Sequence, residues 1–361
     1  MRAIVVDRWM EPADLRVREA PEPELAPGTL AVEVRAAGCN FFDLLMVRGQ
    51  YQVKPPFPFI PGAELAGVVR AAGRGVEGFA AGDRIFASVP LGAFAERAVV
   101  PARSAWRMPA GMSFEAGASF PIVYPTSYAG LVFRAGLGRG ETLLVHAAAG
   151  GVGIAAVQIG KALGARVIAT AGGADKLEVA RRAGADVAIA YRSADWVDQV
   201  RAATDGHGAD VIYDPVGGDV FDASLKCIAW NGRLLVIGFA SGRIPEVKLN
   251  RVLLKNISLV GLHWGAHALH QPERIAETLA ALLALYGEGK VEPVVYRSYP
   301  QATQIQMFPL PSEQPMPDPC AGVPRTRWCP YGGPHSTPAP APTCPPPAAP
   351  CMAVTPPPCA S

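Results

Sequence analysis

The chain has 361 residues, of which half are hydrophobic and 18% are charged, and its formal net charge is +2. A chain of this length has room for about two domains and a substantial core. Its near-neutral charge gives no electrostatic reason to expect binding to nucleic acid or to an anionic membrane.

Signals for secretion and for membrane insertion are missing. Residues 1–8 form a charged, strand-like segment rather than a signal peptide. No uncharged apolar run reaches the roughly 18 residues that a membrane-spanning helix needs. Only two of the seven cysteines, Cys39 and Cys227, lie before residue 310. This distribution suits a reducing compartment, so we expect a cytoplasmic protein.

The front of the chain predicts a small, strongly bent, β-rich domain. Short apolar runs at 30–35, 65–69 and 94–100 are separated by segments rich in Gly and Pro. A turn at Gly82 precedes a further strand at 84–87. Short strands at this spacing are typical of an all-β body.

From about residue 125 strands alternate with helices. The predicted strands cover residues 142–146, 165–170, 186–190, 209–213 and 233–238. The predicted helices between them cover residues 152–163, 174–183, 196–203 and 220–229. This alternation favours a doubly wound parallel sheet. A strand at 257–261, an amphipathic helix at 273–285 and strand-like sequence at 291–298 follow.

The first strand–helix junction carries the most informative motif. Residues 151–156, Gly-Val-Gly-Ile-Ala-Ala, fit the G-x-G-x-x-G/A pattern of a dinucleotide site. We expect Gly151 to allow a tight turn, Gly153 to let the backbone approach a pyrophosphate, and Ala156 to let the helix pack closely. The pyrophosphate would meet unpaired N–H groups at the helix N-terminus. The alternative is a glycine-rich turn in an unrelated α/β protein.

After about residue 308 the composition changes abruptly. Residues 309–361 contain 18 of the 36 prolines and five of the seven cysteines, and they lack Lys, Ile, Phe and Asn. We expect a disordered tail, because this segment cannot bury enough apolar surface to offset its ordering entropy. A Pro-rich ligand for a partner and a disulfide framework are alternatives. A shift of reading frame is the hypothesis that best explains the abrupt change.

With these features in place, the sequence resembles the medium-chain dehydrogenase/reductase superfamily. It is most similar to the zinc-free NADPH:quinone oxidoreductases, the zeta-crystallin-like branch. The segments that carry the likeness are residues 37–51, 61–69, 124–128, 146–153, 213–219 and 261–265. The likeness covers about residues 1–300, and it implies an α/β fold in which a GroES-like catalytic domain joins a Rossmann sheet.

The resemblance also implies the domain boundaries. They are 1–122 for the catalytic domain, 123–258 for the NADPH-binding domain, 259–308 for an incomplete return to the catalytic domain and 309–361 for the tail. The family pattern continues past residue 300 with a helix and a final strand. Residues 301–306 begin like that helix and then break off. A basic residue near the family's C-terminus that helps to bind the cofactor is also missing.

Zinc-dependent alcohol dehydrogenases of this superfamily hold their catalytic metal with three protein ligands. The matching positions here are Asn40, Ala63 and Ile122. The side chains of Ala63 and Ile122 have no lone pair to offer. Cys39 is displaced by one residue, which on a strand would turn it to the opposite face. Three protein ligands are the minimum for a catalytic zinc ion, so we predict that no metal is bound.

The end of the second predicted strand indicates NADPH rather than NADH. An NAD site normally has an acidic residue there, which bonds the ribose 2′-hydroxyl. Residues 169–173 contain no acid, and Lys176 follows shortly. A positive charge suits a 2′-phosphate, and the resemblance implies that Lys176 and Tyr191 bind it. The alternative is a solvated helix charge at Lys176 and a packing residue at Tyr191.

The resemblance extends the expected cofactor site over several loops. The predicted cofactor-binding residues are Asn40, Thr126, Gly150, Gly151, Val152, Gly153, Gly172, Lys176, Tyr191, Gly217, Gly238, Phe239, Ser241, Leu262 and Trp264. We expect Asn40 and Tyr51 to be catalytic. Asn40 would hydrogen-bond the cofactor or a substrate carbonyl, and Tyr51 would donate to a developing oxyanion. The alternatives are a turn residue at Asn40 and a packing aromatic at Tyr51.

The activity that the resemblance implies is reduction of a quinone or an electron-poor enone by direct hydride transfer from NADPH, since the cofactor carries the chemistry. An enoyl thioester is an alternative substrate. A non-catalytic nucleotide-binding role is a second alternative, because relatives in the superfamily serve as lens crystallins or bind AU-rich RNA. A truncated chain without function is the third. The resemblance also implies a homodimer formed through edge strands of the cofactor sheets.

Overall fold

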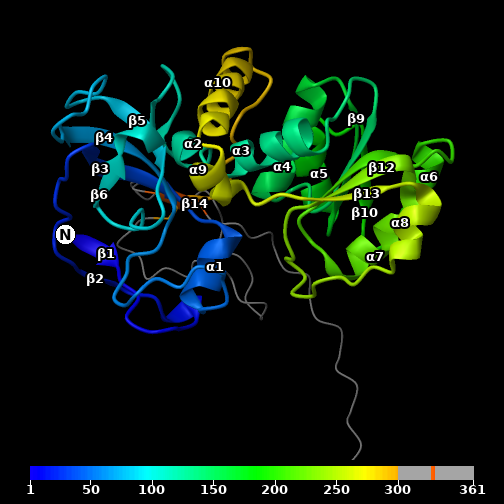
Figure 1. The fold of residues 1–361 in the computed structure, drawn as a ribbon, viewed down its shortest axis with the longest axis horizontal. Coiled ribbons are helices and arrows are strands. Elements are labelled where there is room, and N and C mark those ends of the chain that lie inside the picture. Colours follow the sequence, from blue (N-terminus) through cyan, green and yellow to red (C-terminus); the bar gives the residue numbers. More distant parts are fainter. Residues whose placement is uncertain (300–326, 330–361) are drawn as a thin grey trace, which may run out of the picture.

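The computed structural model describes residues 1–299 and 327–329, and two domains lie side by side in it (Figure 1). One is rich in β-strands and holds the N-terminus, and the other is built from alternating strands and helices. Within the described part of the chain, no helix is long and apolar enough to span a membrane.

The second domain is built around a six-stranded parallel sheet. Its strands are β8 (Thr142–Val145), β9 (Arg166–Ala171), β10 (Val187–Ala190), β11 (Ala209–Asp214), β12 (Ile228–Val236) and β13 (Ser258–Gly261). They lie in the order β10-β9-β8-β11-β12-β13. Counted from β8, this is the order 3-2-1-4-5-6 of dinucleotide-binding folds, with the switch of direction beside β8. The predicted doubly wound parallel sheet is confirmed.

Helices cover both faces of this sheet. They are α4 (Gly151–Ala162), α5 (Ala174–Arg182), α6 (Trp196–Ala203), α7 (Gly218–Cys227) and α8 (Leu249–Lys255). Leu143 and Val145 share one buried cluster with α4 residues, whereas Leu144 shares another with α6 and α7 residues. Successive side chains of a strand point to opposite faces. An uninterrupted apolar run such as β8 therefore fits a strand that is covered on both sides.

His146, directly after β8, is fully buried and joins three elements. Its Nδ1 atom lies 2.8 Å from Thr170 Oγ1, and its Nε2 atom lies 2.8 Å from Ser224 Oγ. The Ser224 hydroxyl donates to the Val220 carbonyl oxygen, so the proton between His146 and Ser224 belongs to Nε2. Burial lowers the pKa of His146 to about 3. This histidine is therefore a neutral packing residue.

The first domain contains a bent sheet. Its strands are β3 (Thr29–Gly38), β4 (Glu64–Ala72), β5 (Arg84–Ser88), β6 (Arg97–Pro101) and β7 (Ala105–Arg107), together with β14 (Arg327–Cys329). The order is β14-β3-β4-β5-β7, and β6 also pairs with β3. Two register shifts interrupt the pairing of β3 with β4, and such bulges bend a sheet. β1 (Arg2–Ile4) and β2 (Val17–Glu19) form an additional antiparallel pair.

Further helices complete the described part of the fold. They are α1 (Phe41–Val47), α2 (Phe114–Ala118), α3 (Val123–Tyr128), α9 (His267–His270) and α10 (Glu273–Gly287). The 3₁₀ turns are η1 (Pro12–Asp14), η2 (Ala102–Ser104) and η4 (Trp264–Ala266), and η3 (Ala129–Arg134) is a π-helical turn. One core cluster contains Phe86 of the first domain, Tyr124 of α3 and Leu279 of α10. The two domains therefore share buried surface.

The predicted strand at 291–298 is not a strand in the structure. The side-chain amide of Gln158 bonds the backbone of Glu292 instead: Nε2 donates to the carbonyl oxygen, and Oε1 accepts from the N–H, both at 2.9 Å. The Tyr124 hydroxyl lies 2.8 Å from the same carbonyl oxygen. A side chain thus supplies the bonds that a neighbouring strand would have supplied.

Two further predictions concern boundaries. The predicted domain boundary after residue 258 falls inside β13, which is the edge strand of the parallel sheet. Within the predicted disordered tail, residues 327–329 form β14 and pair in parallel with residues 36–38 of β3. These three residues alone do not test the prediction that the tail is disordered. The rest of the tail, and residues 300–308 before it, lie outside the described residues.

Candidate functional site

The turn between β8 and α4 has a geometry that differs from the expected one. Gly150 caps α4 with a φ of −83° and a ψ of 167°, and Gly151 is the first helical residue. The left-handed residue in this turn is Ala147, with a φ of 48°. Gly153 is needed for a different reason, because a Cβ atom there would lie 2.3 Å from the Ala147 carbonyl oxygen. The small residue lets α4 pack against the turn that precedes it.

The amino end of α4 is a candidate anion site. In any α-helix the N–H groups of the first turn have no carbonyl partner within the helix. Here those groups belong to Gly151, Val152 and Gly153. They point out of the positive end of the helix dipole, where phosphate groups bind readily. This end lies beside the carboxyl end of β8, at the switch point of the sheet.

A second group of predicted residues gathers after β9 and β10. A Cβ atom on Gly172 would lie 2.8 Å from the Tyr191 hydroxyl, so these two residues are in contact. Lys176 is the third residue of α5, where a positive charge opposes the helix dipole. It forms no ion pair with any residue that the structure describes. An anion bound at this point would be attracted both by the positive end of the α5 dipole and by the charge of Lys176.

A third group lies after β11 and β12. Gly217 has a φ of 68°, and a Cβ atom there would lie 2.9 Å from the Phe239 ring. The N–H of Ser241 donates to the Val216 carbonyl oxygen at 2.9 Å, and a Cβ atom on Gly238 would lie 3.3 Å from the Pro215 carbonyl oxygen. The two loops therefore pack on each other at the carboxyl edge of the sheet.

Asp214, the last residue of β11, organises the first of these loops. Its Oδ1 atom accepts the N–H groups of Val216 at 2.8 Å and Gly217 at 3.0 Å. Burial raises the pKa of this carboxyl group, although the two N–H groups oppose the shift. Sequence reasoning assigned no role to Asp214. The signal was present, since an Asp side chain commonly bonds the backbone two residues on.

Asn40 lies at the start of α1 and is almost fully buried. Its backbone N–H donates to Asp43 Oδ2 at 2.7 Å, which is half of a capping arrangement. Its side-chain Nδ2 donates to Glu64 Oε1 at 2.7 Å. The other oxygen of Glu64 accepts the N–H of Ile122 at 3.0 Å. Asn40 therefore caps α1, and its side chain and that of Asp43 form a capping box. Its catalytic and cofactor-binding roles stay predictions.

Further bonds link this cluster to the glycine turn. The Thr126 hydroxyl donates to the Ile122 carbonyl oxygen at 2.6 Å, and the neighbouring Ser127 hydroxyl lies 2.8 Å from the Val152 carbonyl oxygen of α4. A path of short contacts thus runs from Asn40 through Glu64 and α3 to the amino end of α4. It brings Asn40, Thr126 and Val152 into one neighbourhood.

Two buried carboxyl groups accompany Asn40. Burial raises the pKa of Asp43 to about 7, against two N–H bonds from Asn40 and Gly62 that lower it. Burial raises the pKa of Glu64 to about 8. Asp43 Oδ1 is buried without a hydrogen-bond partner among the described residues. The carboxyl groups of Asp43 and Glu64 therefore exchange protons near neutral pH.

Tyr51, Leu262 and Trp264 are less closely tied to the other predicted residues. The half-buried Tyr51 ring lies 5.5 Å from the ring of Phe42, and burial, followed by the charge of Asp43, raises the pKa of its phenol. Leu262 donates its N–H to the Val236 carbonyl oxygen at 3.2 Å. The Trp264 ring lies 4.8 Å from that of His267. Where they lie in a bound complex stays a prediction.

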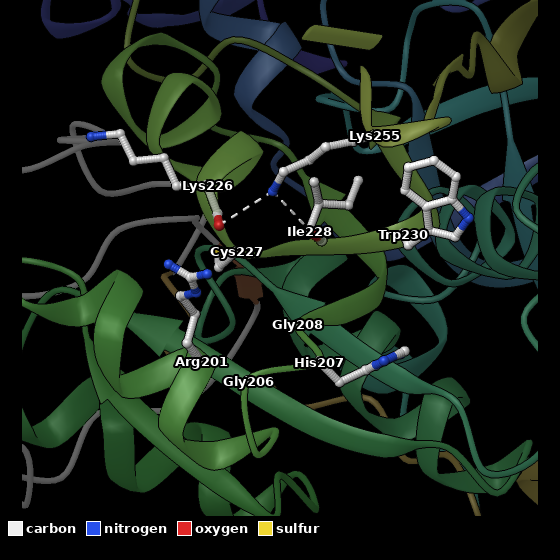
Figure 2. A pocket seen from close by; sticks show the side chains of 9 residues that line it. All are labelled: Arg201, Gly206, His207, Gly208, Lys226, Cys227, Ile228, Trp230 and Lys255. Atoms are coloured by element: carbon white, nitrogen blue, oxygen red, sulfur yellow. Dashed lines mark hydrogen bonds between the residues drawn. The ribbon is translucent and has the colours of Figure 1, made fainter. Parts of the chain in front are cut away.

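Figure 2 shows a pocket at the opposite edge of the parallel sheet, where β11 and β12 begin. Arg201, Lys226 and Lys255 contribute to its lining. Lys255 Nζ donates to the carbonyl oxygens of Leu225, at 3.0 Å, and of Ile228, at 3.3 Å. Its charge therefore caps the end of α7. Parallel sheets bind ligands at the carboxyl ends of their strands, so we do not place the functional site here.

Over residues 1–299 and 327–329, no group of three or more His, Cys, Asp and Glu side chains is arranged to hold a metal ion. Asn40 is bonded to Glu64, and Ala63 and Ile122 offer only apolar side chains. The residues present at the positions of the zinc ligands do not fit a catalytic zinc ion, which needs three protein ligands.

Comparisons with known proteins agree with this architecture. Residues 26–110 match the family described as alcohol dehydrogenase GroES-like domain, and residues 151–284 match the family described as zinc-binding dehydrogenase. A quinone oxidoreductase-like protein 2 homolog from Nematostella vectensis is 40% identical over 301 residues, which are 82% of each chain.

Two solved structures share the fold. A mycobacterial protein solved in complex with NADPH has a TM-score of 0.78 and 34% identity, over 84% of this chain and 94% of that one. Quinone oxidoreductase from Escherichia coli, also complexed with NADPH, has a TM-score of 0.74 and 33% identity, over 81% and 89%. The chain therefore belongs to the medium-chain dehydrogenase/reductase superfamily of oxidoreductases, among the quinone oxidoreductase-like proteins.

Proposed function

We propose that the protein reduces quinones or electron-poor enones with NADPH, by direct hydride transfer and without a metal ion. The observation that carries this proposal is the bonded path from Asn40 to the amino end of α4. This path connects a buried amide, at the position where zinc-dependent relatives would have a metal ligand, to a helix end suited to a pyrophosphate. The polarity that a metal would supply is replaced there by hydrogen bonds.

The residues at the carboxyl ends of β8 and β9 fit NADPH. The first-turn N–H groups of α4 would hold the pyrophosphate. Lys176 and Tyr191 would hold the 2′-phosphate, and the segment from Ala169 to Gly173 has no carboxylate to repel it. Both solved relatives described above contain NADPH. When bound, this cofactor supplies the hydride.

The chain's own residues would orient the reactants and supply a proton. Thr126 and Asn40, which are linked through Ile122 and Glu64, would position the nicotinamide end of the cofactor. The raised pKa of Tyr51 keeps its phenol protonated at neutral pH, so it would donate a hydrogen bond to the substrate oxygen on which negative charge develops. The packed loops that hold Gly217 and Phe239 would line the far side of the cofactor.

A substrate panel tests this proposal. NADPH oxidation would be followed with 1,2- and 1,4-quinones, alkenals and enoyl thioesters, each with and without a metal chelator. We expect turnover of a quinone or an alkenal that the chelator does not change. Turnover of enoyl thioesters alone would move the protein to the enoyl reductases. NADPH binding without turnover of any substrate would leave a non-catalytic nucleotide-binding protein.

We also propose that two copies pair through β13. This strand ends the described order of the parallel sheet, and its Leu259 side chain is 36% exposed. Beside it, α8 exposes Leu249, Leu253 and Leu254, each by more than two thirds. An unpaired strand edge next to an exposed apolar helix is the kind of surface that a partner covers.

A further inference from the structure

The pocket at the amino edge of the parallel sheet has no role in the proposed function. It has a volume of about 190 Å³, and none of the nine described residues that line it is acidic. We propose that this pocket is a second ligand site, which binds a phosphate group, either as free phosphate or as the ester of a small molecule. It is separate from the proposed cofactor site, which lies at the opposite edge of the sheet.

Two positively charged side chains approach each other in the pocket. In Figure 2, Arg201 from α6 and Lys255 from α8 extend toward Cys227, whereas the side chain of Lys226 extends away from both. Burial, followed by the charge of Arg201, lowers the pKa of Lys255. The two cations therefore repel each other, and an anion bound between them would relieve this repulsion.

The Arg201 side chain is available to a ligand. It forms no hydrogen bond or ion pair with any residue in the described part of the chain. Arg201 lies in the last turn of α6, where a cation often only complements the helix dipole. Here the following loop satisfies this helix end, because the Arg201 carbonyl oxygen accepts the N–H groups of Thr204 at 3.2 Å and Gly206 at 2.8 Å. The five N–H donors of the guanidinium group are thus left for a ligand.

Lys255 has a different part in the proposed site. Its Nζ atom lies 3.0 Å from the carbonyl oxygen of Leu225, 3.4 Å from that of Lys226 and 3.3 Å from that of Ile228. Its three N–H groups are therefore engaged. Lys255 offsets the negative end of α7, which would otherwise repel an anion, and adds positive charge to the pocket. We expect the direct hydrogen bonds to the ligand to come from Arg201.

Charge, shape and size select the ligand. Two cations without an acidic neighbour in the lining favour a doubly charged anion over a singly charged one. The planar fork of Arg201 matches two oxygen atoms of a phosphate group. The pocket is smaller than the roughly 300–1,000 Å³ of sites for drug-sized ligands, so it would enclose the phosphate group and a small substituent. Trp230, which is 64% exposed, offers an aromatic surface for that substituent.

A phosphorus NMR titration with inorganic phosphate tests the proposal, at about pH 8, where phosphate is doubly charged. We expect a Kd of about 1 mM for the wild type, as for two charge-assisted hydrogen bonds. Arg201→Gln should weaken binding about tenfold or more, because those bonds are lost. Arg201 is exposed, so this variant should fold as the wild type does.

Lys226→Gln is the matched control. It removes the same charge from a neighbouring position, but from a side chain that extends away from Arg201 and Lys255. At about 0.15 M ionic strength, where exposed charges are largely screened, it should bind phosphate within about twofold of the wild type. Each titration is repeated with excess NADPH, which would occupy the proposed cofactor site. The difference between the two variants should be the same with and without NADPH, so the proposal does not depend on the proposed function.

Phenyl phosphate distinguishes the two sources of the phosphate group. Binding about threefold or more tighter than that of inorganic phosphate, with the gain lost in Trp230→Ala, would identify a phosphate ester as the ligand. Equal binding of the two compounds would identify free phosphate.

Three results would overturn the inference. The first is a wild-type protein that binds no phosphate at ten times the expected Kd. The second is an Arg201→Gln variant that binds phosphate as tightly as the wild type, which would place the anion elsewhere. The third is equal weakening in Arg201→Gln and Lys226→Gln, which would show attraction by the general surface charge and not a site.

Discussion

At the scale of single residues, the front of the site depends on two buried carboxyl groups. Asp43 and Glu64 lie on either side of Asn40, and burial raises the pKa of both, to about 7 and about 8. Unfolding would expose each group and return its pKa to an ordinary value, 3.8 for Asp and 4.5 for Glu. The folded protein therefore keeps protons that the unfolded chain releases.

The sign of the pH dependence follows from this difference. Above about pH 5 the unfolded chain has lost these protons and the folded protein still holds them, so the free energy of unfolding falls as pH rises. It falls by roughly 1 kcal/mol per pH unit for each group until the folded pKa is passed. We predict that Tm decreases steadily from about pH 5 to about pH 8.

Asp43→Asn separates the contribution of one group. Asn cannot ionise, yet its oxygen can still accept the Asn40 N–H. The decrease of Tm between pH 5 and pH 8 should be clearly smaller in this variant than in the wild type. Thermal unfolding at four or five pH values measures it. Identical slopes in the two proteins would show that Asp43 is ionised across this range.

Lys176 determines cofactor preference in this account. Its positive charge lies at the positive end of the α5 dipole, which is unfavourable, and a bound phosphate would offset this repulsion. Lys176→Ala should therefore weaken NADPH binding by about tenfold or more and leave NADH binding nearly unchanged, as expected for the loss of a charge-assisted bond. Lys226→Ala, in the last turn of α7, is the control. An equal loss of both affinities would refute the assignment.

At the scale of elements, the site depends on how closely α4 approaches the turn before it. A Cβ atom on Gly153 would overlap the Ala147 carbonyl oxygen, which is backbone and cannot rotate away. The helix would have to shift, and its N–H groups with it. Packing at this junction thus sets the position of the N–H groups that we propose to bind the cofactor.

We predict that Gly153→Ala destabilises the protein by about 2 kcal/mol or more and weakens NADPH binding. Gly287→Ala is the matched control, because it also lies in a helix and a Cβ atom there would meet nothing within 4 Å. At the control position, helix propensity alone favours Ala over Gly by up to about 1 kcal/mol, so Gly287→Ala should not destabilise the protein. Chemical denaturation of the two variants measures the difference. Equal stability in both would contradict the packing argument.

The elements also show how much of this fold could be predicted from the sequence. The strands and helices of the parallel sheet were found because covered strands are short apolar runs and the helices between them are periodic. The short helices α1, α2 and α3 were not predicted, since seven residues or fewer give too little periodicity. The false strand at 291–298 reflects a tertiary bond, from Gln158 to Glu292, that has no local signal.

The candidate site was predictable in part for the same reason. Glycines and the absence of an acid after β9 are local features, so Gly153, Gly172 and Lys176 could be proposed as site residues from the sequence alone. Glu64 contacts Asn40 and Ile122, which are distant from it in sequence, so only the structure shows its partners. Asp214 bonds the backbone two and three residues on, which is a local signal that the sequence already contained. The tight turn was expected at Gly151, and the structure adds that its left-handed residue is Ala147.

At the scale of the whole molecule, the proposed pairing of two copies rests on the exposed surface of β13 and α8. Leu253 is 78% exposed on α8, and Leu269 on α9 is 80% exposed. Only Leu253 lies on the helix beside the sheet edge. If two sheets meet at β13, a charge at Leu253 should prevent association and a charge at Leu269 should not.

Light scattering on size-exclusion fractions tests this prediction. We expect a dimer for the wild type and for Leu269→Asp, and a monomer or a mixture for Leu253→Asp. A monomeric wild-type protein at micromolar concentration would contradict the proposed pairing.

The central claim is that this molecule transfers a hydride from NADPH without a metal. Single-turnover oxidation of NADPH by a quinone, compared with NADPH deuterated at the transferred position, tests it most directly. The account predicts rapid oxidation that slows with the deuterated cofactor and is unchanged after exhaustive chelation of metals. NADPH that binds but is not oxidised, or oxidation that disappears on chelation, would contradict it.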